Sequence, residues 1–319
     1  AKEICRKDNL TGSVVLLSLD EKPDFPVEAV FSQDIEGNKN PACQLYDKNI
    51  KLIPKDKKQV MIVSSQFGCP LKCEYCAVPI SGFEGNISKE GMISQINFLM
   101  NTFGGNVCEK AKVHFARMGD PVFNWKNVLG VVKELPELNP KYNFLPSFIT
   151  LAPRTSFTEE ALTRFLEIGR HLYQGNVQLQ FSVNSTDEKQ RRKIVQNVPI
   201  WTLKEINNFA EKNREYALHG RRITLNFICA KGYELNPLKL SELVNPELYI
   251  VKLTPVNTSE ASKERGIESD VDYYNPTGRE GIVNRLNSLG FKTIVSVTYK
   301  TEDDNSMGCG QMAFLNQRK

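Results

Sequence analysis

The sequence predicts an α/β fold, a partial (β/α)6 barrel with a small β-rich extension at its N-terminus. Three observations predict it. After residue 60, apolar strand-like runs alternate six times with segments of helical periodicity, which is typical of a parallel sheet with right-handed crossovers. Six such units fit an open, partial barrel better than a closed eight-fold one. The segment 1–59 has short apolar runs and turn residues but no long helical pattern.

The expected extension covers residues 1–59, and the expected barrel core, with a C-terminal cysteine loop, covers 60–319. Short β-type runs predict strands in the extension at 14–19, 27–31 and 50–53. The runs that predict the barrel strands are apolar and rich in branched or aromatic side chains. They lie at 60–63, 113–116, 148–151, 177–183, 223–229, 248–253 and 293–298.

The expected helices carry apolar residues at helical spacing between these strands. The first opens on Ser88, followed by Glu90, as helix starts often do. Glu159 and Glu160 lie in the first turn of the third helix, where the helix dipole favours negative charge. The six helices are expected at 88–100, 124–135, 158–168, 202–213, 237–243 and 278–289, and the polar segment 300–310 is expected to form a loop.

The composition is that of an ordinary globular chain. The 319 residues are 40% hydrophobic and 24% charged, and a chain of this size needs no disulfides to be stable. The net charge of +4 permits nucleic-acid binding without requiring it. No apolar stretch approaches the ~18 residues of a membrane span, and the run at 14–17 lacks a signal-peptide cleavage site. We therefore expect a cytoplasmic monomer that does not bind membranes and whose thiols stay reduced.

Three of the eight cysteines lie within eight residues, with the spacing C-x3-C-x2-C: Cys69, Cys73 and Cys76. A structural zinc site usually takes four ligands as two pairs, and no fourth Cys or His lies nearby in the sequence. Three thiolates in one loop can instead hold three irons of a 4Fe–4S cluster and leave the fourth iron open. A zinc site completed from a distant segment is the alternative.

This spacing, with the aromatic Tyr75 before the last cysteine, resembles the radical S-adenosylmethionine (radical SAM) superfamily. The resemblance implies the (β/α)6 barrel, a 4Fe–4S cluster on Cys69, Cys73 and Cys76, and S-adenosylmethionine (SAM) bound to the open iron. Tyr75 would pack near the adenine. Reductive cleavage of SAM would then give a 5′-deoxyadenosyl radical that abstracts hydrogen.

Further motifs resemble the RlmN/Cfr family, whose members methylate adenine carbons in ribosomal and transfer RNA. They occur in the family's order between about residues 45 and 315: Ser64-Ser65-Gln66-Phe67-Gly68-Cys69, Gly82-Phe83, Gly119-Asp120-Pro121, Ser182-Val183-Asn184, Pro255-Val256-Asn257 and Cys309-Gly310-Gln311. The resemblance implies a methyltransferase, supplied with electrons by a donor such as flavodoxin or ferredoxin.

Three of these motifs supply candidate SAM-binding residues at strand ends. A carboxylate at a barrel mouth can accept hydrogen bonds from an ammonium group, and the resemblance assigns the methionyl amine to Gly119, Asp120 and Pro121. The family stretch usually reads G-x-G-E-P, so Asp120 replaces Glu and Arg117 replaces the first Gly.

Ser182 and Asn184 share a strand face by alternation, and Asn257 follows the sixth strand. These short polar side chains suit the ribose hydroxyls and the carboxylate of SAM. Capping of the strand ends is the alternative role.

Cys309 is the candidate catalytic residue. By the resemblance it takes a methyl group from one SAM, and the radical from a second SAM abstracts hydrogen from that S-methyl, whose carbon then adds to the adenine. A thiolate in a polar loop is a suitable nucleophile. The alternative is an inert loop cysteine.

The sequence departs from the family in two further places. The cysteine that resolves the protein–substrate crosslink normally lies seven residues before the first cluster cysteine, where this chain has Ile62. Cys43, Cys108 or Cys229 could replace it, or be small core residues. The 68 residues before Cys69 do not show the helical pattern of the family's RNA-binding domain. The substrate is therefore expected to be RNA or a nucleotide-type small molecule.

Three hypotheses follow. The first is C-methylation of an adenine-like base through a methylated Cys309. The second keeps the radical chemistry without methyl transfer, so that hydrogen is abstracted directly from a small-molecule or peptide substrate. The third is a non-enzymatic iron–sulfur protein for electron transfer or sensing.

Overall fold

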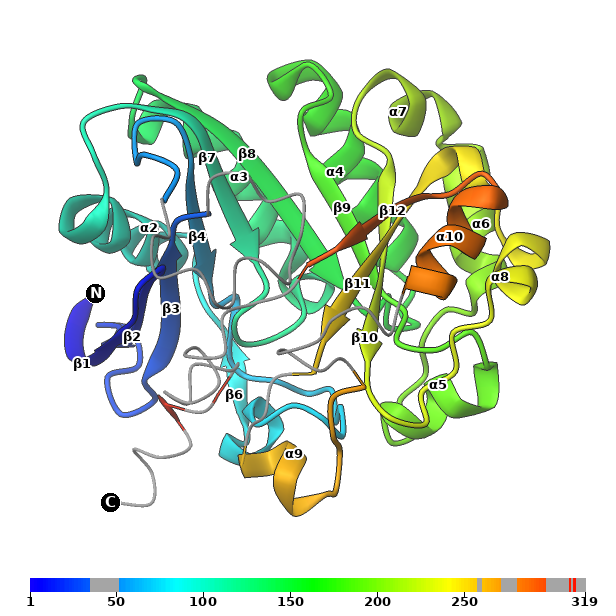
Figure 1. Cartoon of the computed structure of the whole chain (residues 1–319). Helices are drawn as coiled ribbons and strands as arrows, with labels where there is room; N and C mark the ends of the chain where they lie inside the picture. The colour runs from blue at the N-terminus through cyan, green and yellow to red at the C-terminus, as the bar shows by residue number, and fades with distance from the viewer. Residues whose placement is uncertain (35–51, 257–259, 271–279, 297–309, 311, 314–319) are drawn as a thin grey trace.

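The computed structural model describes residues 1–34, 52–256, 260–270, 280–296, 310 and 312–313. Its main sheet has ten strands in the order β1-β2-β3-β4-β7-β8-β9-β10-β11-β12. Figure 1 shows this sheet curving around a central space, with the helices on its outer side. No helix in the described part of the chain is both long and apolar enough to cross a membrane.

Seven strands form the parallel part of the sheet, and every neighbouring pair from β4 to β12 is parallel. They are β4 (Gln59–Val63), β7 (Cys108–Phe115), β8 (Tyr142–Thr150), β9 (Gln178–Ser182), β10 (Ile223–Cys229), β11 (Tyr249–Pro255) and β12 (Lys292–Val295). Each of the first six is followed by at least one helix before the next. The predicted six β/α units and final strand are therefore confirmed.

The connecting helices follow the sequence signals closely. They are α2 (Lys89–Phe103), α3 (Trp125–Leu138), α4 (Thr158–Tyr173), α6 (Leu203–Lys212), α8 (Pro237–Leu243) and α10 (Glu280–Ser288). Ser88 caps α2 by accepting the Gly91 N–H, and Thr202 and Glu205 form a reciprocal capping box on α6. Three short helices were not expected: α5 (Glu188–Ile194), α7 (Arg214–His219) and α9 (Glu260–Glu264).

The N-terminal strands extend the same sheet as an antiparallel continuation: β1 (Lys2–Asp8), β2 (Gly12–Ser18) and β3 (Val27–Ser32), with β3 against β4. Strand β1 was not expected because its sequence, KEICRKD, is mostly charged. Charged residues are common on an edge strand, where they oppose pairing with other chains. A separate two-stranded sheet, β5 (Gln66–Gly68) with β6 (Phe83–Asn86), was not expected either.

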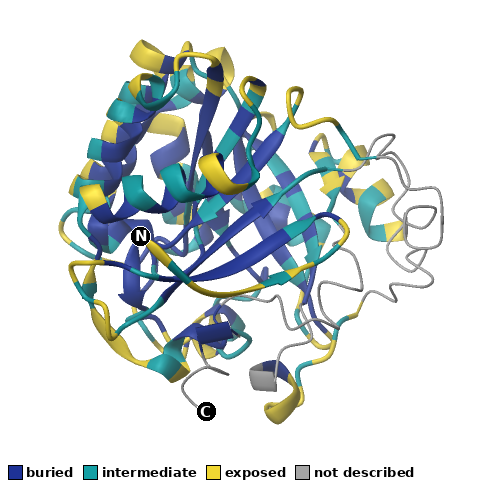
Figure 2. Ribbon diagram, turned by 90° about the vertical axis from the view of Figure 1, so that its left-hand side faces the viewer, coloured by how far each residue is buried: buried dark blue, intermediate teal, exposed yellow. Residues whose placement is uncertain are grey.

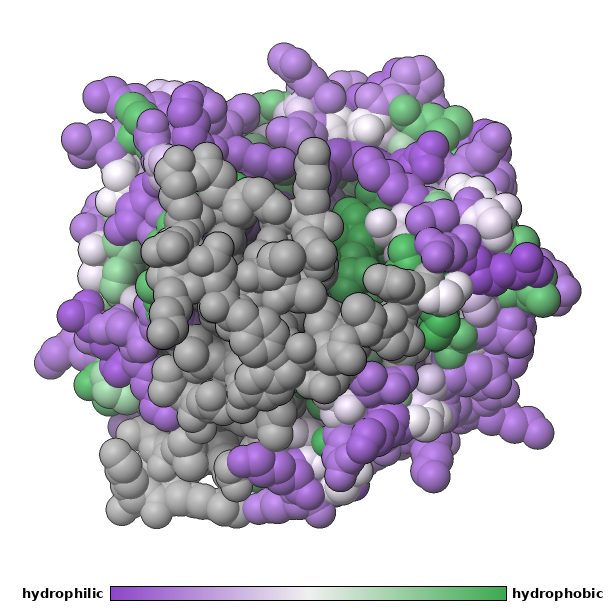
Figure 3. Space-filling model, viewed as in Figure 1, coloured by the Kyte–Doolittle hydropathy of each residue, from purple (hydrophilic) through white to green (hydrophobic). Residues whose placement is uncertain are grey.

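The hydrophobic core lies between the sheet and the surrounding helices. Figure 2 shows buried residues along the strands and on the helix faces turned toward them. In Figure 3, which is viewed as Figure 1, hydrophilic residues cover most of the surface formed by the described residues. Along β7, core residues alternate with half-buried polar ones, so the sheet presents a second, more polar face to the central space.

Candidate functional site

A cavity of about 260 Å³ lies at the carboxyl ends of the parallel strands, where α/β barrels carry their functional residues. It is lined by residues that follow or end six strands: Cys69, Leu71, Cys73, Tyr75, Cys76, Val78, Ala116, Arg117, Gly119, Asp120, Ile149, Thr150, Leu151, Ser182, Asn226, Ile228, Thr254, Pro255 and Val256. The fold thus brings together all three clustered cysteines with Tyr75, Gly119, Asp120 and Ser182.

The cysteine loop is fastened to the barrel by its backbone. The Cys69 N–H donates to the Gly82 carbonyl at 3.3 Å, and the Cys76 N–H donates to the Cys73 carbonyl at 3.1 Å. Between them, the Glu74 N–H donates to the Ile194 carbonyl at 2.9 Å. These bonds leave the sulfur-bearing side chains on the cavity wall.

The thiols of the loop suit a cationic partner. Burial is the main cause that raises the pKa of the Cys69 thiol, and burial likewise raises that of Cys73 to about 12. The thiolate is the form that binds metals, so these buried sulfurs need positive charge beside them to ionise. The irons of a cluster would supply that charge, and the donor set therefore fits a 4Fe–4S cluster.

A single metal ion fits this loop less well. Within the described residues, no group of three or more His, Cys, Asp or Glu side chains could hold a metal ion. A zinc ion needs its ligands to converge on one point at about 2.3 Å, whereas a cluster binds each thiolate at a different iron. Three thiolates in one loop are the donor set that such a cluster would take.

Gly68, directly before Cys69, offers a first test of the loop. It has φ +83°, and an added Cβ would lie 1.9 Å from the Gly82 carbonyl oxygen. We expect Gly68→Ala to lower the free energy of unfolding by more than about 2 kcal/mol and to reduce iron content, because the loop must move.

Gly82→Ala is the matched control for this prediction. Gly82 has nearly the same φ, +84°, but an added Cβ would meet nothing within 4 Å. Its cost is then backbone strain alone, about 1–3 kcal/mol, without the steric clash that Gly68→Ala adds. Urea unfolding of both variants, with iron analysis, measures the difference, and equal effects of the two would contradict the argument.

Asp120 lies at the cavity, but protein groups already use much of its carboxylate. It accepts hydrogen bonds from the Thr150 hydroxyl at 2.7 Å, the Leu151 N–H at 2.8 Å and the Val122 N–H at 3.0 Å. Burial raises its pKa to about 6, and these donors partly oppose that shift. The carboxylate is therefore held in one orientation beside the cysteine loop.

Ser182 and Asn184 do not occupy equivalent positions. Ser182 lines the cavity. The buried Asn184 has a left-handed backbone, with φ +68°, and its amide donates to the Tyr75 hydroxyl at 3.1 Å while its Oδ1 has no hydrogen-bond partner. An orphaned buried acceptor usually marks a group that a ligand or water satisfies.

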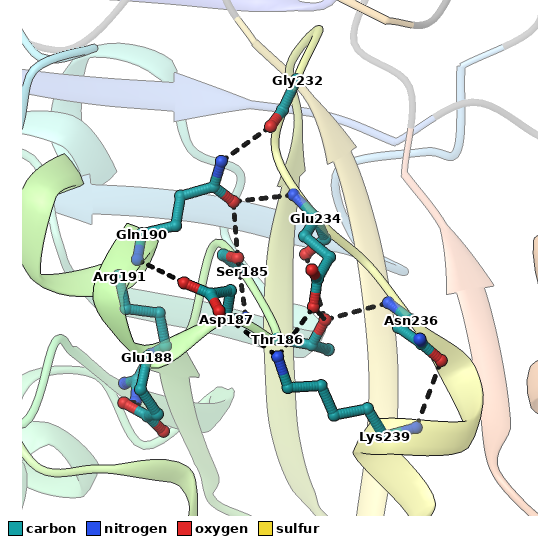
Figure 4. Close-up of polar contacts among 10 residues, drawn as sticks. All are labelled: Ser185, Thr186, Asp187, Glu188, Gln190, Arg191, Gly232, Glu234, Asn236 and Lys239. Carbon is teal, nitrogen blue, oxygen red and sulfur yellow. Dashed lines mark hydrogen bonds and ion pairs between the residues drawn. The ribbon is translucent and has the colours of Figure 1, made fainter.

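A polar network holds the segment that follows Asn184. Figure 4 shows Gln190 joining Ser185 to the backbone of Gly232 and Glu234. The buried Arg191 guanidinium donates from Nε to the Val183 carbonyl at 3.2 Å and pairs with Glu188. Most of these contacts join residues of the network to one another, and none of these side chains lines the cavity. The network therefore holds the segment after Asn184 in place and does not contact a ligand in the cavity.

Glu28 was missed at the sequence level, although a lone acid inside the apolar strand 27–31 was a usable signal. Its fully buried carboxylate accepts the Arg117 Nε–H at 2.7 Å. It also accepts the backbone N–H groups of Gly310 and Ala313, each at 2.9 Å. Strand β3 is thereby bonded to a cavity-lining arginine and to the residue that follows Cys309.

Gly310 is packed against the cavity wall. An added Cβ there would lie 2.5 Å from the Val78 backbone nitrogen, and Val78 lines the cavity. Cys309, Asn257 and Cys43 themselves lie outside the described residues.

The described cysteines outside the cluster do not line the cavity. Cys108 is buried at the first residue of β7, the end of that strand away from the cluster. Cys229 is buried in the hydrophobic core, next to the cavity-lining Ile228 but on the opposite strand face. Neither is placed to replace the cysteine that is absent at Ile62.

Comparison with known proteins finds relatives in sequence and in fold, whereas no protein-family model matches the chain. A protein named probable dual-specificity RNA methyltransferase RlmN from Trichodesmium erythraeum is 28% identical over 265 residues, which are 82% of this chain and 69% of the relative. Its counterpart from Trichormus variabilis is 28% identical over 270 residues, covering 83% and 69%.

The fold is similar to that of a radical SAM methyltransferase from Sphaerobacter thermophilus. The TM-score is 0.65 at 17% identity, over 97% of this chain and 80% of the other. At this low sequence identity, the similarity shows only that the two proteins share a fold. The cavity and its three cysteines lie at the place in that fold where the functional residues are expected. The chain is an enzyme distantly related to the RlmN methyltransferases, and it shares its fold with a radical SAM methyltransferase.

Proposed function

We propose that this enzyme methylates a carbon of an adenine-like base, in RNA or in a nucleotide-type small molecule, and that Cys309 carries the methyl group. One observation carries the proposal. Gly310, which follows Cys309, donates its N–H to Glu28 and packs against Val78, a residue that lines the cavity. The relatives named RNA methyltransferases support the reaction class.

The superfamily uses a 4Fe–4S cluster and SAM, which together supply a carbon radical able to remove hydrogen from unactivated positions. Cys69, Cys73 and Cys76 would hold the cluster. Gly119, Asp120 and Pro121 would bind the methionyl amine, with the carboxylate of Asp120 fixed by Thr150 and Leu151. Tyr75 would pack near the adenine.

Asn184 and Asn257, with Ser182, would bind the ribose and the carboxylate of SAM. The unpartnered Oδ1 of Asn184 is an acceptor suited to a ribose hydroxyl. The Cys309 thiolate would attack the methyl carbon of one SAM, forming an S–CH3 bond and displacing S-adenosylhomocysteine. The S-methyl group formed in this way is the hydrogen donor for the radical step.

The test is to supply SAM with a deuterated methyl group to the reduced enzyme. We expect mass spectrometry to find the label on Cys309 and, with a competent substrate, on the product. Cys309→Ala is expected to lose both, whereas Cys229→Ala, a change at a buried core cysteine, is expected to retain them. Absence of label on Cys309 and on every product would refute methyl transfer.

A second candidate function is hydrogen abstraction directly from the substrate, without methyl transfer. Ile62 at the position of the resolving cysteine favours it, since Cys108 and Cys229 do not line the cavity. Its signature is a Cys309→Ala variant that still forms 5′-deoxyadenosine together with an altered substrate.

A further inference from the structure

The inner face of the barrel carries a group of basic side chains below the cavity. In β7, Lys110, Lys112 and His114 alternate with three residues of the hydrophobic core. They share the strand face of Ala116, which lines the cavity. In β11, Lys252 lies two residues before Thr254, another lining residue. Both strands therefore turn basic residues into the same central space.

The curvature of the sheet brings these cations close to one another. Strands β7 and β11 are separated by β8, β9 and β10 in the sheet order. Nevertheless Lys112 is close enough to Lys252, Lys58 and Arg221 for their charges to act on it. In register, Lys252 is paired with Asn226, which lines the cavity. The group, here termed the basic lumen, comprises Lys58, Lys110, Lys112, His114, Arg221 and Lys252.

Little negative charge offsets the basic lumen within the described residues. Lys58 pairs with Asp34, but no ion pair or hydrogen bond of the described residues involves the side chain of Lys110, Lys112, Arg221 or Lys252. The ring Nε2 of His114 is buried without a hydrogen-bond partner. The hydroxyl of Ser147, which is paired with His114 in the register of β7 and β8, is also buried without a hydrogen-bond partner.

Uncompensated cations in a partly dry interior are costly, and a bound anion removes that cost. Lysine ammonium groups bind phosphate as point charges, and a low local dielectric strengthens the attraction. All six residues are half-buried, and Lys110, Lys112, His114 and Lys252 lie on the inner strand faces. An RNA backbone would instead contact exposed surface. A compact anion suits this position better than a polymer.

We propose that the basic lumen binds the phosphate groups of a nucleotide-type small-molecule substrate, beneath the cavity that holds the cluster cysteines. That the anion belongs to the substrate rests on the proposed function. The binding itself does not, because it can be measured without any methyl transfer.

The test is calorimetric binding and thermal unfolding of the as-purified enzyme with tripolyphosphate, ATP, adenosine and a single-stranded RNA oligomer. We expect tripolyphosphate and ATP to bind and raise Tm, and adenosine to do neither. Lys112→Met and Lys252→Met are each expected to weaken ATP binding by about tenfold to a hundredfold, the effect of losing one charged hydrogen bond. Without anion, each should raise Tm by roughly 2–4 °C.

Lys231→Met is the matched control, since Lys231 is an exposed surface lysine that pairs with Glu268. It is expected to change neither ATP affinity nor Tm. The proposal is overturned if ATP does not bind, if the lumen variants bind it as tightly as the control, or if only the RNA oligomer binds. Failure of Cys309 labelling would not affect these measurements, so the two proposals fail separately.

The gain in stability from Lys112→Met should also depend on pH. Burial, followed by the charges of Lys252, Lys58, Arg221 and Lys110, lowers the pKa of Lys112 from 10.5 to about 7; His114 also faces it. Between these values the unfolded chain binds a proton that the folded chain does not, so wild-type stability rises with pH. The difference in the free energy of unfolding between Lys112→Met and the wild type should be largest at and below about pH 7 and vanish near pH 10.5. A gap that is constant over this range would contradict the buried position.

Discussion

Replacement of Cys73 by alanine is expected to abolish cluster assembly and all SAM cleavage. The three cysteines are the only thiols among the described residues that line the cavity, and Cys73 is 7% exposed. With one ligand removed, only two thiolates of the loop remain to hold a cluster. Iron and sulfide content and the yield of 5′-deoxyadenosine after reduction measure the loss, which should reach the level without protein.

Cys108→Ala provides the control for this prediction. Cys108 is as buried as Cys73, at 1% exposure, but begins strand β7 at the opposite end of the barrel. Its loss should leave iron content and SAM cleavage unchanged. A Cys73→Ala enzyme that retains wild-type iron and cleavage would remove Cys73 from the ligand set.

Replacement of Glu28 by glutamine is expected to lower the free energy of unfolding by about 3–5 kcal/mol. The change removes the buried carboxylate that is ion-paired with Arg117, which is itself only 5% exposed. In the wild type, the Glu28 carboxylate accepts hydrogen bonds from the Arg117 guanidinium and from the N–H groups of Gly310 and Ala313. In the variant, the amide NH2 group of glutamine would face some of these donors and could not accept from them. Urea unfolding measures the change.

Two further variants separate the charge effect from the hydrogen bonds. Glu268→Gln removes a carboxylate that is 66% exposed and paired with an equally exposed Lys231, so it should cost less than about 1 kcal/mol. Adding Arg117→Met to Glu28→Gln removes the buried cation that faces position 28 and should restore part of the stability. A loss below about 1 kcal/mol for Glu28→Gln alone would show that the pair does not stabilise the fold.

The repeating pattern of the barrel could be predicted because it is local. Each strand and helix is specified by side-chain periodicity within about a dozen residues, and strand β10 and helix α8 have the predicted bounds, 223–229 and 237–243. The cluster motif is local too, since its three cysteines lie within eight residues. Strand β1 escaped prediction because an edge strand needs no apolar run.

What the sequence determined by itself is the barrel and the chemistry of its cysteine loop, because periodicity and close spacing both act over short stretches of chain. Only the tertiary structure decided which distant groups meet. The Glu28 carboxylate joins a residue 282 positions away, and β7 and β11 bring their lysines into one lumen across three intervening strands. Such contacts follow from sheet curvature and register, which place side chains together in space without leaving a mark in either local sequence.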